Sequence, residues 1–472
     1  MTEITTFETN AAASPPRHRH ADWFAEARAL VALGAPLVLT QLAQMAVVTT
    51  DVVMVGSLGQ GALAACALGA TLFVFSWLVG VGPASAVSPI IAHILGANPR
   101  NRAGVRASVR MGLWAAILIT PALWGFLAFS KPILFAMNEP AELVNGAAGY
   151  VLAIAGGLPF ILGFNVLRNF VTALSRPRAV LFTVLAMIAV NFAGNYIFIF
   201  GHFGAPALGL VGSGLSSAIA NAFAFFVMLA VALRARAFAH YRILRRFHRP
   251  DWGKLKEIFR LGVSIGVTQL FEVTLFAAST FLMGQFGTAA LAAHQIAINV
   301  PSITFMVPLG ISMAATVRVG LAAGAGDLHG VRRAGLVAMA LGGGFMALCG
   351  IGLALFPRTI AGWYLPDTAD NAAAIALAAT FLRVAAAFQL FDGLQVLGVG
   401  LLRGLKDARV PMWLAGGAYW LIGFPLAVFL GFGFGLEGLG VWLGLAAALF
   451  AAAAAMVLRF FHKSGILAPY WR

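Results

Sequence analysis

The sequence predicts an all-α membrane protein in which twelve transmembrane helices form two pseudo-symmetric lobes of six helices each. Three observations predict this fold class: an apolar composition, an alternating distribution of basic residues, and an internal repeat. Hydrophobic residues make up 61% of the chain and charged residues only 10%, and the mean hydropathy is +0.91. A soluble protein of 472 residues does not have such a composition, so soluble enzymes and soluble binding proteins are excluded.

Nearly uncharged stretches of about 20 residues or more recur along the whole chain, and each is long enough to cross a bilayer as a helix. The 53 glycines and 20 prolines do not argue against helices, because transmembrane helices tolerate both. The twelve predicted spans lie near residues 30–57, 62–95, 104–130, 141–167, 179–201, 208–233, 258–285, 289–322, 334–356, 372–402, 410–434 and 438–460.

Basic residues fall in alternate loops between these spans. Of the 31 Lys and Arg residues, only Lys131, Arg358 and Arg383 fall toward one side of the membrane. The rest, including Arg168 and Arg403, fall toward the other side. By the positive-inside rule that side is the cytoplasm, so both termini and the central loop are expected there. Because the net charge of +15 follows this pattern, it does not indicate nucleic-acid binding.

The chain contains two copies of one unit, offset by 228 residues. The sequence Thr-Gln-Leu at 40–42 recurs at 268–270. Glycines recur at the same offset, among them the pairs Gly34 and Gly262, Gly82 and Gly310, and Gly96 and Gly324. Each copy holds six spans, an even number, so both lobes enter the membrane in the same orientation. Parallel repeats of this kind are typical of transporters whose site lies between the lobes.

The spans and the repeat together predict how the chain is divided. The segment between the lobes is rich in Arg and Lys and is expected to be a solvated connector, with a lipid or regulatory site as the alternative. The predicted segments are a cytoplasmic N-terminal tail at 1–28, a first lobe at 29–234, the basic linker at 235–256, a second lobe at 257–463 and a C-terminal tail at 464–472.

Three acidic residues, Asp51, Glu272 and Asp392, lie inside apolar stretches with no Lys or Arg close in sequence. The other acidic residues of the chain lie in tails, loops or helix ends. A carboxylate in the hydrocarbon layer costs about 2.5–3.5 kcal/mol on insertion scales, so it normally faces a cavity or an ion path. These three acids are therefore the first candidates for a functional site.

Polar neighbours give two of these acids a context. Thr40, Gln44 and Asp51 are spaced by four and seven residues, which places them on one face of a helix. The repeat gives Thr268 and Glu272 an equivalent face in the second lobe, with the carboxylate at a different depth. Both lobes are therefore expected to line something polar with their first helix.

Asn191 and Asn195 lie one helical turn apart and share a face of the fifth span. With Asp51 they offer several oxygen atoms and no cation. A carboxylate surrounded by amide oxygens can hold a proton or a small hard cation such as Na⁺. Hydrogen bonding between helices is the alternative role of the two asparagines.

Other polar residues at membrane depth are candidates for lining a substrate cavity: Gln44, Thr268, Gln295, Asn299 and Gln389. For Gln295 and Asn299, ordinary packing and hydrogen bonding are the competing roles. Pro36 is a candidate hinge in the first span, although transmembrane helices also tolerate proline without any such role.

Four segments carry a resemblance to a known family. They are 41–56, 261–276 with its Phe-Glu-Val, 292–297 reading Ala-Ala-His-Gln-Ile-Ala, and 389–407, which begins Gln-Leu-Phe-Asp-Gly-Leu-Gln-Val and ends Leu-Arg-Gly-Leu-Lys-Asp. Over about residues 30–460 the chain resembles the multidrug and toxic compound extrusion (MATE) transporters, and among them the NorM-type branch. This resemblance implies a V-shaped pair of lobes.

The resemblance also implies an activity. MATE transporters are antiporters that export small amphipathic, often cationic, drugs or dyes, using inward movement of Na⁺ or H⁺. They alternate access to the two sides by rocking of the lobes. The expected protein is therefore not an enzyme, needs no cofactor, and acts as a monomer in the bacterial inner (plasma) membrane, with the lipid bilayer and its drugs as partners.

The resemblance assigns site residues in both lobes. In the second lobe, Glu272 and Asp392 match the two carboxylates of the Na⁺ site in NorM-type proteins. In the first lobe, the residues that match a proton or Na⁺ site are Asp51, Asn191, Asn195 and Ser217. The position of Asn195 is an Asp in some archaeal relatives, which puts a first-lobe relay of two carboxylates in doubt.

A lipid-linked precursor flippase of the same superfamily is the first alternative to an antiporter. It would need basic residues in its cavity for a phosphate headgroup, whereas the middle of these spans carries acids and almost no Lys or Arg. A membrane-embedded enzyme is disfavoured, because no zinc-binding His pair or nucleophile elbow occurs at membrane depth. An ion channel stays open as an alternative, because polar helix faces also line pores.

Overall fold

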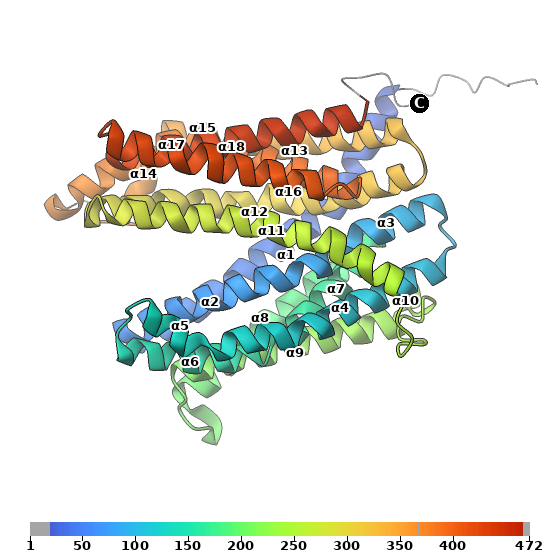
Figure 1. The fold of residues 1–472 in the computed structure, drawn as a ribbon, viewed down its shortest axis with the longest axis horizontal. Coiled ribbons are helices and arrows are strands. Elements are labelled where there is room, and N and C mark those ends of the chain that lie inside the picture. Colours follow the sequence, from blue (N-terminus) through green and yellow to red (C-terminus); the bar gives the residue numbers. More distant parts are fainter. Residues whose placement is uncertain (1–18, 367, 466–472) are drawn as a thin grey trace, which may run out of the picture.

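The computed structural model describes residues 19–366 and 368–465. Most of the two terminal tails predicted at 1–28 and 464–472 therefore lies outside the described residues. Within them every regular element is a helix, and the helices form two bundles, one from each half of the chain (Figure 1). The predicted all-α fold class is confirmed.

The first half of the chain contains α1 (Arg19–Gly56), α2 (Gln60–Ser85), α3 (Val87–Ala97), α4 (Arg102–Ala128), α5 (Ser130–Ala136), α6 (Ala141–Ala155), α7 (Leu158–Ala173), α8 (Arg178–Phe200) and α9 (Leu210–Arg234). The short α10 (Arg236–Ala239) follows. The second half contains α11 (Trp252–Gly284), α12 (Thr288–Gly324), α13 (Leu328–Leu355), α14 (Pro357–Gly362), α15 (Ala372–Gly404), α16 (Arg409–Gly416), α17 (Phe424–Val428) and α18 (Glu437–Lys463). Two π-helical segments, Gly417–Gly423 and Phe429–Gly433, make α16 and α17 parts of one continuous span.

Eleven helical segments among the described residues are long and apolar enough to cross a membrane, and α2 with α3 forms one of them. The helices α6 and α7, bent by 46° at their junction, give a twelfth span when counted together. The break falls at Gly156 and Gly157, where a Cβ on Gly157 would lie 2.8 Å from Cα of Ala218 on α9. The close approach of α9 thus explains why glycine occupies this break.

The bent fourth span corrects one expectation. From the sequence, the span ends near residue 167 and Arg168 belongs to the next loop. In the structure α7 continues to Ala173, and Arg168 lies inside it with 9% of its surface exposed. Arg403 also lies within a helix, in the last turn of α15. The expectation was wrong because, in the sequence alone, a single basic residue near the end of an apolar stretch cannot be told from a residue that flanks a membrane span.

Most of the basic residues lie in the connections after α3, α7, α9, α12 and α15 or in the adjoining parts of the helices, and the helix order brings them to one end of the molecule. We call this the basic end. In Figure 1 it lies on the right, where the two bundles come together, whereas they lie apart on the left. The result is the V shape that the resemblance implies.

Glycines allow the two halves to approach closely near the basic end. A Cβ on Gly262 of α11 would lie 2.6 Å from the backbone nitrogen of Pro83 on α2, and one on Gly82 would lie 2.8 Å from the backbone nitrogen of Gly266. The symmetry-related contact joins α12 to α1, where a Cβ on Gly310 would lie 2.6 Å from the backbone nitrogen of Val38. Small residues are what such backbone-to-backbone packing of membrane helices needs.

An ion pair also joins the halves at the basic end. Arg318 on α12 donates two hydrogen bonds to the Glu26 carboxylate on α1, one of them 2.8 Å long. Arg333 on α13 lies 3.5 Å from Asp22 and 4.0 Å from Glu26. Because Glu26 is only 5% exposed, this pair is less screened by water than a surface pair.

Replacing Glu26 with Gln is expected to destabilise the closed basic end by about 1–2 kcal/mol, because Arg318 and Arg333 lose their buried counter-charge. The measurement is the distance between spin labels on Asn98 and Ala325, in the loops after α3 and α12, in a chain without its native cysteines. The longer distances should gain population. Glu142→Gln removes an exposed acid from α6 and serves as the control. An unchanged distance distribution in Glu26→Gln would contradict the prediction.

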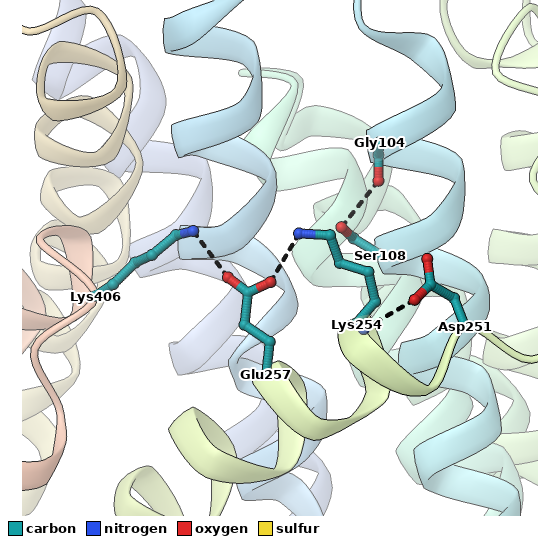
Figure 2. A network of polar contacts seen from close by, with 6 residues as sticks. All are labelled: Gly104, Ser108, Asp251, Lys254, Glu257 and Lys406. Carbon is teal, nitrogen blue, oxygen red and sulfur yellow. Dashed lines mark hydrogen bonds and ion pairs between the residues drawn. The ribbon is translucent and has the colours of Figure 1, made fainter.

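The start of α11 is held by a small polar network (Figure 2). The Asp251 carboxylate accepts a hydrogen bond of 3.0 Å from the backbone N–H of Lys254 and so caps the helix. One turn later, Glu257 lies between two lysines and accepts from Lys254 at 2.7 Å and from Lys406, in the loop after α15, at 2.9 Å. These charged residues explain why α11 begins at Trp252, earlier than the apolar pattern predicts.

The segment expected to be a solvated connector is exposed over much of its length and packs against the first half in part. Phe238, Tyr241 and Ile243 are buried against the first half. Arg106 on α4 donates a hydrogen bond of 2.9 Å to the Tyr241 carbonyl, and the Trp114 indole donates one of 2.9 Å to the Phe247 carbonyl. The apolar residues between the arginines thus find a surface on α4 and its neighbours, while Arg242, Arg245 and Arg249 stay exposed.

Candidate functional site

In the first half, a cluster of polar side chains surrounds Asp51. Asn195 on α8 donates a hydrogen bond of 2.5 Å to one Asp51 oxygen, and Ser217 on α9 donates one of 2.9 Å to the other. Asn191 donates to the Ser217 hydroxyl at 3.3 Å. The two asparagines are completely buried, and the side-chain amide oxygen of Asn195 (Oδ1) has no partner among the described residues. The geometry therefore groups the four residues that the resemblance selected.

In the second half, Glu272 on α11 and Asp392 on α15 line the same cavity of about 260 Å³. The other walls are mainly apolar and aromatic, with Phe276, Phe305 and Phe388 among them. Both carboxylates thus line one cavity from two different helices, with aromatic side chains beside them. Such walls attract organic cations through the ring quadrupole.

Several buried oxygen atoms around these two carboxylates have no hydrogen-bond partner among the described residues. They include Oδ1 of Asp392, Oε1 of Gln395 and the hydroxyl of Tyr419. Gln395 lies one turn of α15 beyond Asp392, and Tyr419 belongs to the π-helical segment 417–423. Buried polar atoms normally find a partner, so this set of oxygens suits a cation that supplies one.

The two sites differ in how far the protein satisfies its own carboxylates. Both Asp51 oxygens accept hydrogen bonds from side chains. Asp392, by contrast, is 5% exposed and has an oxygen with no partner among the described residues. No group of three or more His, Cys, Asp or Glu side chains suited to a metal ion occurs within the described part of the chain. A cation at either site would therefore also use amide, hydroxyl or water oxygens.

The predicted cavity residues lie in several places. Gln44 lines a second cavity, which lies between the two halves. The Thr268 hydroxyl donates to the Ser264 carbonyl of its own helix at 2.8 Å, and Gln389 is buried and donates to the Thr304 hydroxyl at 2.7 Å. Neither Thr268 nor Gln389 lines the cavity of Glu272 and Asp392.

The remaining candidates lie on or within long helices. Gln295 and Asn299 are exposed on α12, and Asn299 accepts a hydrogen bond of 2.9 Å from the Tyr364 hydroxyl. Pro36 lies inside α1, which continues through it to Gly56. The Thr40 hydroxyl donates to the Pro36 carbonyl at 2.7 Å. The hinge role of Pro36 stays a prediction.

Sequence reasoning missed two arginines. Arg168 and Arg403 both line the cavity between the halves, together with Gln44 and with Gln41 and its repeat partner Gln269. The argument that the middle of the molecule lacks basic residues therefore needs correction. The signal that could have found Arg168 is its position one residue after a predicted span whose end was set too early.

Comparison with known proteins identifies the family. The MatE family model matches residues 36–197 and 264–429, well over half of the chain, and the two matches correspond to its two repeats. The chain belongs to the MATE family. This is a family of transporters, and its two-lobed arrangement is the one described above.

Curated relatives match this MATE protein over nearly its full length. A probable multidrug resistance protein NorM from Mesorhizobium japonicum is 43% identical over 449 residues, which cover 95% of this chain and 96% of the relative. One of the same description from Brucella suis is 39% identical, covering 93% of each. Among solved structures, an outward-facing multidrug resistance MATE family transporter of the MOP superfamily superposes with a TM-score of 0.83 at 19% identity, covering 94% of this chain and 96% of that one. This likeness supports the fold.

Proposed function

We propose that the chain is a secondary active multidrug efflux antiporter, which exports amphipathic, mostly cationic, compounds in exchange for Na⁺ or H⁺. The observation that carries this proposal is the cavity in the second half, which two acidic side chains line together with aromatic ones. The relatives named as multidrug resistance proteins support the same reading.

The coupling ion is proposed to bind at Glu272 and Asp392. A small hard cation prefers oxygen ligands, and Asp392, Gln395 and Tyr419 each have a buried oxygen without a partner among the described residues. The first half provides a second site for a proton or Na⁺ at Asp51, where both carboxylate oxygens accept hydrogen bonds from side chains of the same cluster. Na⁺ is thus assigned first to the second half.

Transport proceeds by alternating access. In the conformation described here the basic end is closed by the glycine contacts and by the Glu26–Arg318 pair. A cation arriving from the opposite side occupies the carboxylates and favours release of the drug on that side. Drug that enters from the basic side favours the opposite occupancy, with drug bound and the carboxylates free of the cation. Coupling follows only if each ligand has different affinities for the two conformations.

The basic end is proposed to face the cytoplasm, because the loops and helix ends there carry most of the Lys and Arg residues. The protein then lies in the bacterial inner membrane with both termini on the cytoplasmic side, and works as a monomer. This orientation makes the open end of the V face outward.

The test uses everted vesicles loaded with a fluorescent cationic dye. Adding Na⁺ to the medium outside the vesicles, or imposing a pH step, should release accumulated dye if the protein is an antiporter. A dye gradient should also drive a second dye uphill by counterflow, which a channel cannot do. Dye movement that only runs down its own gradient would overturn the proposal in favour of a channel.

A further inference from the structure

The cavity between the two halves is positively charged. It has a volume of about 170 Å³ and is bordered by α1, α2, α3 and α7 from the first half and by α11, α12 and α15 from the second. Its lining contains two arginines, Arg168 and Arg403, and no Asp or Glu. In sign it is therefore the opposite of the cavity that contains Glu272 and Asp392.

Arg168 is 9% exposed, and none of its contacts is an anion. One of its terminal nitrogens donates long hydrogen bonds to Gln41 at 3.4 Å and Gln44 at 3.3 Å. Its Nε has no partner among the described residues. No described carboxylate lies within 4.0 Å of its guanidinium, since none of the ion pairs in the described part of the chain includes it.

The surrounding groups are also incompletely satisfied. Arg403, half-buried, makes no hydrogen bond or ion pair with the described residues and interacts with Glu272 only over a longer distance. The Thr172 hydroxyl, 1% exposed, lines the cavity without a partner among the described residues, and so does Oε1 of Gln269. Arg168 and Thr172 from the first half and Arg403 from the second therefore bring hydrogen-bond donors to one cavity, whereas the Gln269 oxygen is an acceptor.

An arginine that is removed from water needs a counter-charge or several strong acceptors, because the cost of burying an unpaired charge is large. The planar guanidinium matches carboxylate and phosphate oxygens in particular, which it can bind through two parallel N–H groups. Amide oxygens at 3.3 and 3.4 Å meet this need only in part. The cavity has the chemistry of a receptor for an oxyanion.

We propose that Arg168 and Arg403 bind a carboxylate or similar oxyanion group of the cargo, so that the transporter accepts zwitterionic amphiphiles. This assignment rests on the proposed efflux function. The positive cavity lies beside the cavity of Glu272 and Asp392, to which Arg403 is electrostatically linked. A molecule with both charges can thus use arginines for its anionic end and carboxylates for its cationic end.

The test compares a rhodamine dye that bears a free benzoate with the methyl ester of the same dye. Binding to the purified full-length protein is followed by fluorescence anisotropy, so the result does not depend on transport. We expect Arg168→Gln and Arg403→Gln to weaken binding of the carboxylate dye by about tenfold and that of the ester by less than about twofold. Arg168→Lys keeps the charge but loses the planar fork, and should fall between wild type and Arg168→Gln.

Retained ester binding shows that a variant is folded, and Arg403→Gln provides a second variant should the buried Arg168 be needed for folding. Arg383→Gln is the matched control, because it removes an exposed arginine of α15 outside the cavity. Equal losses for both dyes, or no loss for either, would overturn the inference. If the variants discriminate the dyes but wild-type protein releases neither dye under a gradient, the efflux function fails and the anion site stands.

The source of the oxyanion is tested in the same assay. Inorganic phosphate is added to the binding reaction, and the protein is reconstituted in nanodiscs with and without phosphatidylglycerol. If the oxyanion that binds here belongs to the cargo, neither phosphate nor the anionic lipid should compete with the carboxylate dye at millimolar levels. Competition by phosphate would assign the site to a free anion, and competition by the lipid to a headgroup, and either result would overturn the cargo assignment.

Discussion

Replacing Glu272 with Gln, or Asp392 with Asn, is expected to abolish the release of dye driven by Na⁺. Each change keeps the shape of the side chain and removes one of the two carboxyl groups that line the cavity. Bound Na⁺ forms an opposite-charge pair with each carboxylate, and loss of one partner from such a buried pair costs about 2–5 kcal/mol, so the Na⁺ concentration for half-maximal release should rise by about thirtyfold or more. Because both acids face the same space, the double variant should be little worse than either single variant.

The measurement is dye release from everted vesicles after addition of Na⁺ at fixed pH, compared with release after a pH step at fixed Na⁺. Glu142→Gln, which removes an exposed acid of α6, should behave as wild type. The Na⁺ assignment to the second half is wrong if release follows only the pH step and persists in both variants. In that case the Asp51 cluster in the first half becomes the coupling site to examine.

The membrane spans were predictable because each depends on local composition. Apolar stretches separated by basic loops identify helices without reference to how they pack. The exceptions have local causes. The fourth span is two helices, since the Gly156-Gly157 break allows α9 to approach, and α11 starts early because Asp251 caps it and lysines neutralise Glu257.

The candidate site was predictable in part. Asn191 and Asn195 share a face by their spacing alone, and a lone intramembrane Asp normally faces a polar partner. Their contact with Asp51 was an expectation that the sequence alone could not establish, because it depends on how α1 and α8 pack. The arginine cavity was not predictable, since Arg168 and Arg403 come from different halves and face one space only after the halves close.

The repeated glycines are a pattern whose cause only the packing explains. Gly82 and Gly310 are repeat partners, and each faces the other half of the molecule through a backbone contact. Gly96 and Gly324 stand in the same relation, whereas a Cβ on Gly34, the repeat partner of Gly262, would meet α12 only at ordinary van der Waals distance, 3.8 Å from Cα of Ile311. Both copies therefore supply the same surfaces to one interface, which closes the basic end in a nearly two-fold manner. The repeat thus supplies both sides of the contact that opens in the proposed alternating-access cycle.

Adding a single methyl group at this interface is expected to shift the protein toward the conformation in which the basic end is open. In Gly262→Ala the new Cβ would lie 2.6 Å from the backbone nitrogen of Pro83, and in Gly82→Ala 2.8 Å from the backbone nitrogen of Gly266. Backbone atoms cannot rotate away, so α2 and α11 must separate. Overpacking of this kind costs about 1–3 kcal/mol, which changes the ratio of closed to open molecules by about 5–150-fold.

The measurement is again the distance between spin labels on Asn98 and Ala325, which should lengthen in most molecules of either variant. The same two helices offer matched controls. A Cβ on Gly61 of α2 or on Gly284 of α11 meets no atom within 4 Å, so Gly61→Ala and Gly284→Ala should leave the distances unchanged. If all four variants give the wild-type distribution, the contact between α2 and α11 does not hold the basic end closed. If the controls open it as well, helix propensity rather than the interface governs the equilibrium.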